Sequence, residues 1–182
     1  MENIMKTAYC ILGLVATVSF VTTVSEYKMD EYKAHIVLTE SNDYPSVSHI
    51  ENELDCMAMN IYREAEGEPF EGKVAVAQVT MNRVAHEDFP DTVCGVVYEK
   101  NVFMQRVVCQ FSWHCSNRIR ARTINARAYE ESYEIAKKVI LEDFELESVK
   151  DAIYFHSDSV SPNWRYQQVV KIGNHIFYKA QS

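Results

Sequence analysis

The 182-residue sequence contains no internal repeat, no low-complexity tract and no excess of positive charge. Its 18 Lys and Arg residues stand against 26 Asp and Glu residues, which gives a net charge of -8. Because nucleic-acid-binding domains normally carry a broad basic face, this balance argues against nucleic acid as a partner. With 47% hydrophobic and 24% charged residues, the composition predicts one compact domain with some appended sequence.

Zinc-binding patterns are also missing. No two cysteines form a C-x-x-C pair, and their spacings match no common zinc site, so we expect neither a metal nor a cofactor. Cys10 lies in an apolar run, and four cysteines follow it, at positions 56, 94, 109 and 115. In an oxidising compartment these four predict two disulfides, with at least one formed by Cys94, Cys109 or Cys115, while the three pairings remain open.

Acidic residues are absent from Asn101 to Tyr129, where five arginines fall. Such a segment is suited to an anionic ligand, but it would equally offset acidic helices elsewhere in the fold. The sequence alone assigns it no role.

The N-terminus carries an uncharged run from Thr7 to Ser25, preceded by Lys6. The run has about 19 residues, just enough to cross a hydrocarbon core, but Gly, Ser and Thr dilute it and no A-x-A-like triplet precedes Glu26. Residues 1–25 are therefore interpreted as either a signal peptide or a membrane anchor, with membrane association through residues 7–25 in the second case. Both predict an exported protein, in the periplasm or cell envelope.

Two helices are predicted on either side of a glycine turn at Gly67, after a polar linker over residues 26–47. The domain is expected to span residues 48–182. Ser48 and Glu51 have the S-x-x-E form of a capping box, which predicts a helix that begins there. Its buried stripe has helical spacing and consists of Leu54, Met57, Ala58, Ile61 and Ala65. Pro69 suits the first position of the second helix, whose spacing continues through Val74, Ala77, Gln78, Met81 and either Val84 or Ala85.

The rest of the chain changes from helical to β-prone patterns. Residues 93–98 are too few to assign, and residues 101–125 show no clear period, which predicts an irregular stretch. A third amphipathic helix is carried by Ala128, Tyr129, Ser132, Ala136, Val139 and Ile140. Residues 152–155, 169–172 and 175–178 are β-prone, and the last two flank Gly173 and Asn174, a two-residue hairpin signal. The order predicts an α+β fold that is mainly helical with a small C-terminal antiparallel hairpin.

Glu64 has the surroundings of a proton donor. Cleavage of a sugar acetal needs a carboxyl whose pKa is raised by an apolar pocket, and Glu64 falls at a helix end where the helix dipole also disfavours its anion. Its sequence neighbours are largely apolar: Tyr62, Ala65, Pro69 and Phe70. Three further acids, Glu66, Glu68 and Glu71, crowd the same turn, and such a cluster is also typical of a solvated surface. Composition alone therefore does not select Glu64.

A longer motif surrounds this turn. Residues 64–72 read E-A-E-G-E-P-F-E-G, and residues 75–84 read A-V-A-Q-V-T-M-N-R-V. The motif resembles that of the spore-cortex-lytic, SleB-like family of cell wall hydrolases. Further similar segments lie at residues 89–98, 109–113, 154–156, 162–164 and 172–178, so the resemblance runs from Leu54 to Tyr178. One departure is Glu66, where the family commonly has Arg.

The resemblance implies a lysozyme-like fold, peptidoglycan glycan strands as the partner, and Glu64 as the catalytic acid. It also implies that a second carboxylate can be absent, because the muramyl C6 hydroxyl can attack the anomeric carbon as in a lytic transglycosylase. A muramidase that uses water would need a second carboxylate, and Glu68 and Glu71 are the candidates.

Five residues are predicted to contact substrate. Gln110, Ser112 and Trp113 fall in the irregular stretch, and His156 and Trp164 lie on or beside the β-prone segments. Structural roles remain open for each, with Trp113 in the core and Gln110 as a buried amide. For Asn82 and Arg83 a structural role, in which they tie the turn together, also remains open.

Two other functions also remain open. A non-catalytic wall-binding or assembly protein could keep the same fold, although Glu64 beside an intact Gly67-Glu68-Pro69 turn favours the enzyme. A zinc amidase would draw on His86, His114, His156 or His175, but the chain contains no H-E-x-x-H motif.

Overall fold

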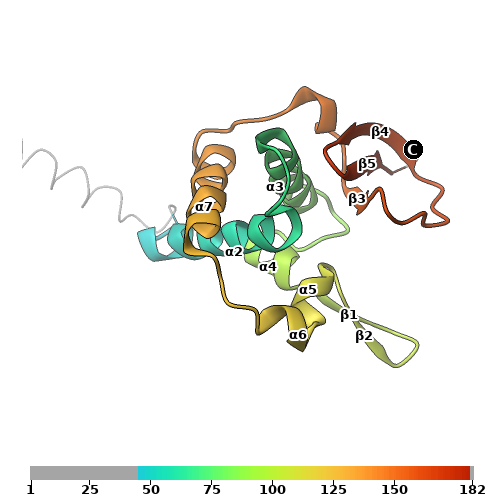
Figure 1. Ribbon diagram of the computed structural model, residues 1–182, viewed down its shortest axis with the longest axis horizontal. Coiled ribbons are helices and arrows are strands. Elements are labelled where there is room, and N and C mark those ends of the chain that lie inside the picture. Colours follow the sequence, from blue (N-terminus) through green and yellow to red (C-terminus); the bar gives the residue numbers. More distant parts are fainter. Residues whose placement is uncertain (1–44, 181–182) are drawn as a thin grey trace, which may run out of the picture. The chain divides into compact units, whose positions relative to one another are not determined.

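Within residues 45–180, the part of the chain that this computed structural model describes, three long helices precede a small C-terminal sheet (Figure 1). The long helices are α2 (Val47–Ala65), α3 (Phe70–Val84) and α7 (Ala126–Leu141). Between α3 and α7 lie α4 (Val93–Tyr98), the strands β1 (Lys100–Phe103) and β2 (Arg106–Cys109), α5 (Ser112–Cys115) and α6 (Asn117–Arg120). A 3-10 turn, η1 (Glu147–Val149), leads to β3 (Tyr154–Ser157), β4 (Gln167–Ile172) and β5 (His175–Lys179). The predicted α+β, mainly helical class is confirmed.

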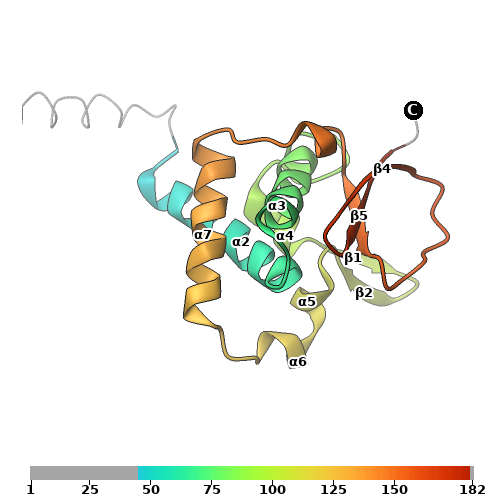
Figure 2. The ribbon, with the colours of Figure 1, turned by 45° about the horizontal axis from the view of Figure 1, so that its top comes forward.

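Helix α3 lies between two hydrophobic clusters. Its Val74 and Ala77 join residues of α2, α4 and α7 in the larger cluster, whereas Val76 and Val79 pack with Val149 and Phe177 in the smaller one. Every α3 residue from Gly72 to Thr80 is buried. Figure 2 shows α3 between the α2–α7 pair and the C-terminal sheet. The helix therefore holds the sheet against the helical core.

The stripe predicted on α2 is confirmed, because all five of its residues are buried: Leu54, Met57, Ala58, Ile61 and Ala65. Burial of a large apolar side chain of this kind stabilises the fold by about 1.5–3 kcal/mol. The predicted start is wrong by one residue, since α2 begins at Val47 and Ser48 lies in its first turn. The second helix begins one residue later than predicted, at Phe70, and Pro69 is its N-cap.

The segment predicted as irregular contains a β-hairpin. Strands β1 and β2 pair in antiparallel fashion, and the two residues of their turn, Met104 and Gln105, have φ values of 47° and 63°. Left-handed turns of this kind usually carry Gly, Asn or Asp, so the turn had no sequence signal. The strands also lack an apolar-polar alternation because all but Cys109 are exposed. Residues 93–98, left unassigned above, form α4, capped by Thr92 Oγ1, which accepts from the Gly95 N–H at 3.0 Å.

The C-terminal sheet has the strand order β3-β5-β4, with both pairings antiparallel. The two-residue turn at Gly173 and Asn174 is confirmed, and Gly173 has a φ of 55°. Glycine is required there for a second reason: a Cβ would lie 1.9 Å from Glu68 Oε2. The predicted hairpin thus supplies the central strand, β5, and one edge strand, β4, of a three-stranded sheet.

Two disulfides confirm the reading of the cysteines. Cys56–Cys94 joins α2 to α4, and Cys109–Cys115 joins the end of β2 to α5. The first closes a sequence separation of 38 residues and the second of 6. Each cross-link therefore anchors one end of the segment that carries the β1–β2 hairpin.

The predicted signal or anchor, and all of the linker before its last three residues, lie outside the described residues. Among residues 45–180, no helix is long and apolar enough to cross a membrane. The described residues from Val47 onward form one compact unit.

Removal of the two disulfides is expected to have unequal effects. The loop-closure entropy of the unfolded chain predicts a loss of about 4 kcal/mol for Cys56→Ala/Cys94→Ala and of about 2 kcal/mol for Cys109→Ala/Cys115→Ala. Urea unfolding of both variants and a free-thiol count on the native protein would check this. Equal losses, or reactive thiols at these four cysteines in native protein, would contradict it.

Candidate active site

Glu64 is the next-to-last residue of α2 and is half-buried. Burial raises the pKa of its carboxyl from 4.5 to about 7, and the nearby positive charge of Arg83 opposes that rise. The helix ends directly after it, where the Glu68 N–H donates to the Ala65 carbonyl at 3.0 Å. Close to neutral pH, Glu64 is therefore balanced between its acid and its anion, as a general acid requires.

Arg83, on α3, is the buried cation beside Glu64, with only 4% of its surface exposed. Its Nε donates to the Ile153 carbonyl at 2.8 Å, and its guanidinium lies over the rings of Phe89 and Phe111, at 5.4 and 5.2 Å from the centroids. With the Gln110 amide oriented to satisfy both groups, its oxygen accepts from Nη1 and Nη2 at 3.1 and 3.3 Å. Burial lowers the pKa of Arg83 to about 10, so it remains charged near neutral pH.

Asn82 adds a second connection from α3. Its Nδ2 donates to the Val149 carbonyl at 3.0 Å and to the Ala152 carbonyl at 2.7 Å. Asn82 and Arg83 therefore fix the segment that leads from η1 into β3. The carbonyls that they bind lie 67 to 70 residues further along the chain, so these hydrogen bonds connect α3 to that segment and not to the turn after Glu64.

A cavity of about 430 Å³ opens between the hairpin and the C-terminal sheet. It is lined by Arg83, Asn101, Val108, Cys109, Gln110, Tyr154, Phe155, His156, Trp164 and Tyr166. Glu64 is not among the lining residues, but its charge partner Arg83 is. The rings of Tyr154 and Tyr166 stack with centroids 4.0 Å apart, and Trp164 lies edge-on to His156. A cavity with aromatic walls and a few polar groups is typical of a ligand site.

Of the five predicted substrate contacts, Gln110, His156 and Trp164 line this cavity. Ser112 is exposed at the start of α5 and does not line it. Trp113 belongs to the core instead: only 4% of its surface is exposed, and its Nε1 donates to Asn60 Oδ1 at 3.0 Å. The helical turn of α5 points this large ring inward, which removes Trp113 from the candidate contacts.

His156 forms part of the cavity wall with both ring nitrogens engaged. Nδ1 lies 2.8 Å from the Ser157 carbonyl, and Nε2 lies 2.8 Å from the Tyr178 hydroxyl. A carbonyl only accepts, so Nδ1 carries the proton and Nε2 accepts from the hydroxyl. His156 therefore offers a ligand its ring surface and not a free nitrogen.

Sequence reasoning did not foresee the charge pairing of Arg83 with Glu64, nor the roles of Tyr154 and Tyr166 in the wall. Tyr166 stands in a loop with no periodic pattern, so no local signal marks it. Arg83 had one weak signal, a charged residue within an otherwise apolar helix.

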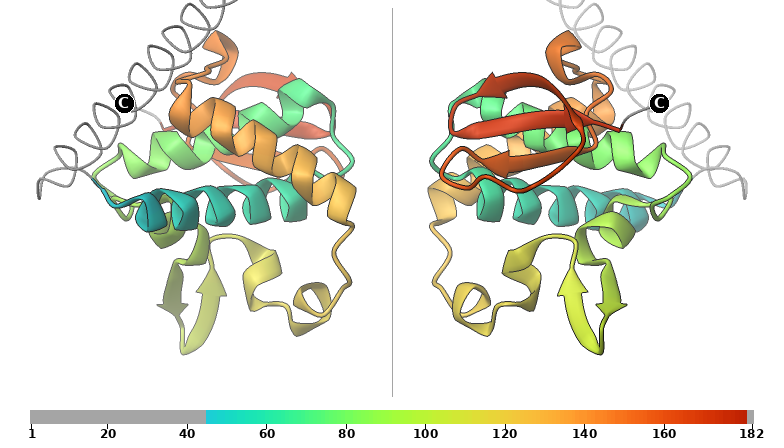
Figure 3. Two further views of the ribbon diagram at one scale, coloured as in Figure 1. Left: turned by 90° about the vertical axis from the view of Figure 1, so that its left-hand side faces the viewer. Right: turned by 90° about the vertical axis from the view of Figure 1, so that its right-hand side faces the viewer.

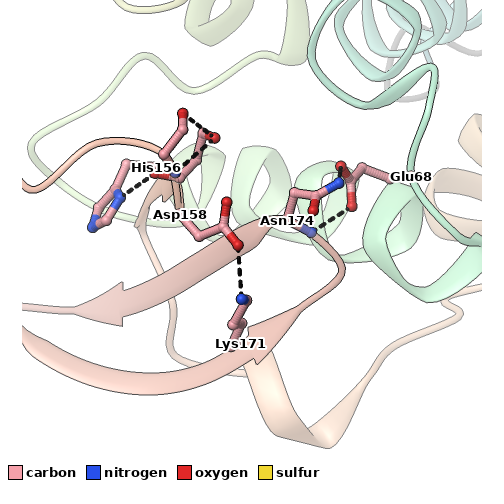
Figure 4. Close-up of polar contacts among 7 residues, drawn as sticks. Glu68, His156, Asp158, Lys171 and Asn174 are labelled. Atoms are coloured by element: carbon pink, nitrogen blue, oxygen red, sulfur yellow. Dashed lines mark hydrogen bonds and ion pairs between the residues drawn. The ribbon is translucent and has the colours of Figure 1, made fainter.

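Glu68 is held by the tip of the β4–β5 turn (Figure 4). Its Oε2 accepts from the Asn174 backbone N–H at 2.8 Å and its Oε1 from Asn174 Nδ2 at 3.0 Å. Figure 4 also shows the Lys171–Asp158 ion pair on the same sheet, with Nζ 2.7 Å from Oδ2. The turn that follows Glu64 is thus attached to the sheet through the Glu68 carboxylate, both of whose oxygens accept hydrogen bonds from Asn174.

Among residues 45–180, no group of three His, Cys, Asp or Glu side chains lies close enough to hold a metal ion. The polar chemistry of the described site comes from Glu64, Arg83 and the residues of the cavity. Together they define a class: a small, mainly helical domain with a protonatable carboxyl whose charge partner, Arg83, lines a cavity.

The chain belongs to the cell wall hydrolase family, whose model matches residues 67–178. It is 33% identical over 133 residues to the spore cortex-lytic enzyme of Bacillus cereus, a match that covers 71% of this chain and 45% of that protein. It is 32% identical over 141 residues to the same enzyme of Oceanobacillus iheyensis, covering 74% and 46%. The chain thus spans less than half the length of these curated relatives.

Solved structures of the same kind confirm the fold. The catalytic domain of the Bacillus cereus SleB protein aligns with a TM-score of 0.51 and 29% identity, over 76% of this chain and 94% of that one. The catalytic domain of the germination-specific lytic transglycosylase SleB from Bacillus anthracis aligns with a TM-score of 0.51 and 30% identity, over 76% and 98%. The resemblance inferred from the turn motif is therefore confirmed at the level of family and fold.

The raised pKa of Glu64 predicts a pH-dependent stability. Between pH 4.5 and about 7 the folded protein keeps a proton that the unfolded chain has released, so the free energy of unfolding falls as pH rises through this range. The full shift corresponds to at most about 3 kcal/mol. In Glu64→Gln this decrease in the free energy of unfolding should disappear. The variant should therefore be more stable than the unmodified protein at pH 8 but not at pH 4. Urea unfolding at both pH values measures the difference, and parallel pH profiles would refute the burial of the charge.

A second prediction concerns the Glu68–Asn174 contact. Glu68→Gln keeps one acceptor but turns an NH2 group toward an N–H donor, so we expect a loss of about 1–2 kcal/mol in the free energy of unfolding. Glu71→Gln is the control, because Glu71 is exposed and is expected to matter by less than about 0.5 kcal/mol. A double-mutant cycle with Asn174→Ala should give a non-additive coupling, and strict additivity would show that the contact contributes nothing.

Proposed function

We propose that this protein cleaves the glycan strands of peptidoglycan at the muramyl glycosidic bond, with Glu64 as its single catalytic acid. The observation that carries the proposal is the Glu64 carboxyl, whose pKa is raised to about 7, at a helix end in a chain of the cell wall hydrolase family. Glu64 precedes the matched residues by only three positions, and its turn is continuous with them.

The opposing effects on Glu64 suit both halves of the reaction. Burial keeps the carboxyl protonated, so that it can donate to the glycosidic oxygen as the C–O bond breaks. Once the proton has left, the guanidinium of Arg83 stabilises the anion that remains. Because Arg83 is held by Ile153 and Gln110, this charge needs no rearrangement when the anion forms.

The second half of the proposed reaction uses the same group as a base. The muramyl C6 hydroxyl attacks the anomeric carbon, its proton passes to the Glu64 carboxylate, and a 1,6-anhydro ring closes as the leaving strand departs with the first proton. No water is consumed and the acid is regenerated. A hydrolytic route would instead need a second carboxylate to activate water or to form a glycosyl intermediate.

The surroundings of the other acids favour the route with one carboxylate. Both oxygens of Glu68 accept hydrogen bonds from Asn174, which ties this carboxylate to the sheet. Glu71 is exposed in the first turn of α3. The printed description of the Bacillus anthracis relative as a lytic transglycosylase supports the same route.

Substrate is proposed to enter the cavity beside Arg83. Gln110 offers an amide NH2 once its oxygen is engaged with the guanidinium, and Trp164, 41% exposed, offers an aromatic face to a sugar ring. His156 contributes the edge of the same wall. These three residues remain as proposed substrate contacts.

A location outside the cytoplasm, in the periplasm or cell envelope, follows from the proposed substrate. The two disulfides support it, because such bonds persist in oxidising compartments. The free-thiol count described above also tests this location, since protein taken from a reducing compartment would show reduced cysteines.

The activity prediction is that Glu64→Gln lowers kcat/KM on purified peptidoglycan by a factor of about 10² to 10⁴, because the amide cannot donate a carboxyl proton. In the unmodified protein, kcat/KM should fall as pH rises through about 7, since the protonated form is then lost. Mass spectrometry of released fragments should find muramyl ends lighter by one water than hydrolysed ends.

Glu66→Gln is the matched control, an exposed acid on the same turn that should keep activity within a few-fold. Near-normal lysis by Glu64→Gln would eliminate Glu64 as the acid. Hydrolysed muramyl ends alone would rule out the transglycosylase route but keep a glycosidase. Fragments cut only in the peptides would overturn the proposed function.

A further inference from the structure

The β1–β2 hairpin carries a run of exposed apolar side chains. The exposed fractions are 75% for Val102, 64% for Phe103, 82% for Met104, 59% for Val107 and 50% for Val108. Figure 3 shows the hairpin extending away from α2, with α5 at its base. Small soluble domains rarely leave so many neighbouring apolar side chains in water without a binding partner.

The strand register divides these residues between two faces. Asn101 pairs with Val108 and Phe103 pairs with Arg106, so these four side chains share one face. Lys100, Val102, Val107 and Cys109 form the two pairs of the opposite face. Asn101 and Val108 both line the cavity beside Arg83, as does Cys109 at the base of the hairpin, where β2 ends. Phe103 and Arg106 therefore continue the same wall outward, about 7 Å further along the strands.

The other wall of the cavity is aromatic at its rim. Trp164 is 41% exposed and Tyr166 is 36% exposed, and both line the cavity opposite the hairpin strands. Aromatic faces on two sides of a cleft suit the apolar faces of sugar rings. Phe103 supplies such a face on the hairpin side.

Charge adds a second requirement on the occupant. No Asp or Glu occurs from Asn101 to Tyr129, and Arg106 stands directly opposite Phe103 on the cavity-side face of the hairpin. A polymer of sugars that carries carboxylates on short peptides meets both requirements, because it offers ring faces to Phe103 and anions to Arg106.

We propose that Asn101, Phe103, Arg106 and Val108 form an outer subsite for a glycan strand with anionic peptide stems. This inference rests on the proposed function and extends its binding site beyond the cavity. A sugar packs against the Phe103 ring between the hairpin and Trp164, and a stem carboxylate lies within reach of Arg106. The hairpin thus favours long, peptide-bearing strands over short or denuded ones.

The test measures binding of the full chain, in a Glu64→Gln background, to purified insoluble peptidoglycan. Phe103→Ala should raise the apparent Kd about tenfold, which corresponds to about 1.4 kcal/mol. Val102→Ala is the matched control, an exposed apolar residue on the opposite face, and should change the Kd by less than a factor of about two. Because Phe103 is exposed, neither variant should change the urea midpoint.

Arg106→Gln separates the peptide from the sugar. It should weaken binding several-fold at low salt, less so as ionic strength rises, and not at all on glycan strands whose peptides have been removed. The subsite is overturned if Phe103→Ala and Val102→Ala change the apparent Kd for peptidoglycan equally, or if neither changes it.

A different occupant would also overturn the proposal. If the protein dimerises with rising concentration, and both Phe103→Ala and Val102→Ala abolish dimerisation, the hairpin binds a second copy of the chain. If the protein binds anionic lipid vesicles, and both substitutions abolish that binding, the hairpin binds a membrane. The subsite and the proposed function fail separately. If the protein with Glu64 intact lyses peptidoglycan, and Phe103→Ala lyses it equally well, the subsite alone is refuted. If Phe103→Ala weakens binding and Val102→Ala does not, but the protein with Glu64 intact shows no lysis, the catalytic proposal alone is refuted.

Discussion

The buried guanidinium of Arg83 is the group on which the rest of the domain depends. A charge in the interior is tolerated only when its donors are satisfied, and here Ile153, Gln110 and two aromatic rings surround it. These partners come from the residue before β3, from the two residues after β2 and from the loop after α3. One cation therefore brings the helical core, the hairpin and the C-terminal sheet to a common point, and Glu64 lies next to it.

The pKa of the Glu64 carboxyl reflects a balance between two physical effects. Desolvation at the end of α2 raises the pKa of the carboxyl, and the nearby cation limits that rise to about 7. Without the cation the pKa of the carboxyl would be higher still, and without burial the group would be an anion at neutral pH. Because the proton is lost as pH rises through about 7, the same burial lowers the stability of the folded protein at alkaline pH.

Helix α3 and the polar contacts at its two ends explain how so small a sheet is held in place. Its two buried faces serve separate hydrophobic clusters, Asn82 holds the carbonyls before β3, and Glu68, just before the helix, holds the turn between β4 and β5. The cavity is formed where this sheet meets the hairpin.

Local patterns in the sequence determined the long helices, the Gly173-Asn174 turn, the disulfide-forming cysteines and the motif around Glu64, because each is encoded within a few residues. Only the tertiary structure decided that Trp113 enters the core, that Glu68 binds Asn174 across 106 residues, and that Arg83 reaches Ile153 across 70. The β1–β2 hairpin was missed because its turn lacks glycine and its strands are exposed, which leaves no alternation to recognise. Contacts between distant segments form only when the core brings these segments together, so no local sequence pattern predicts them.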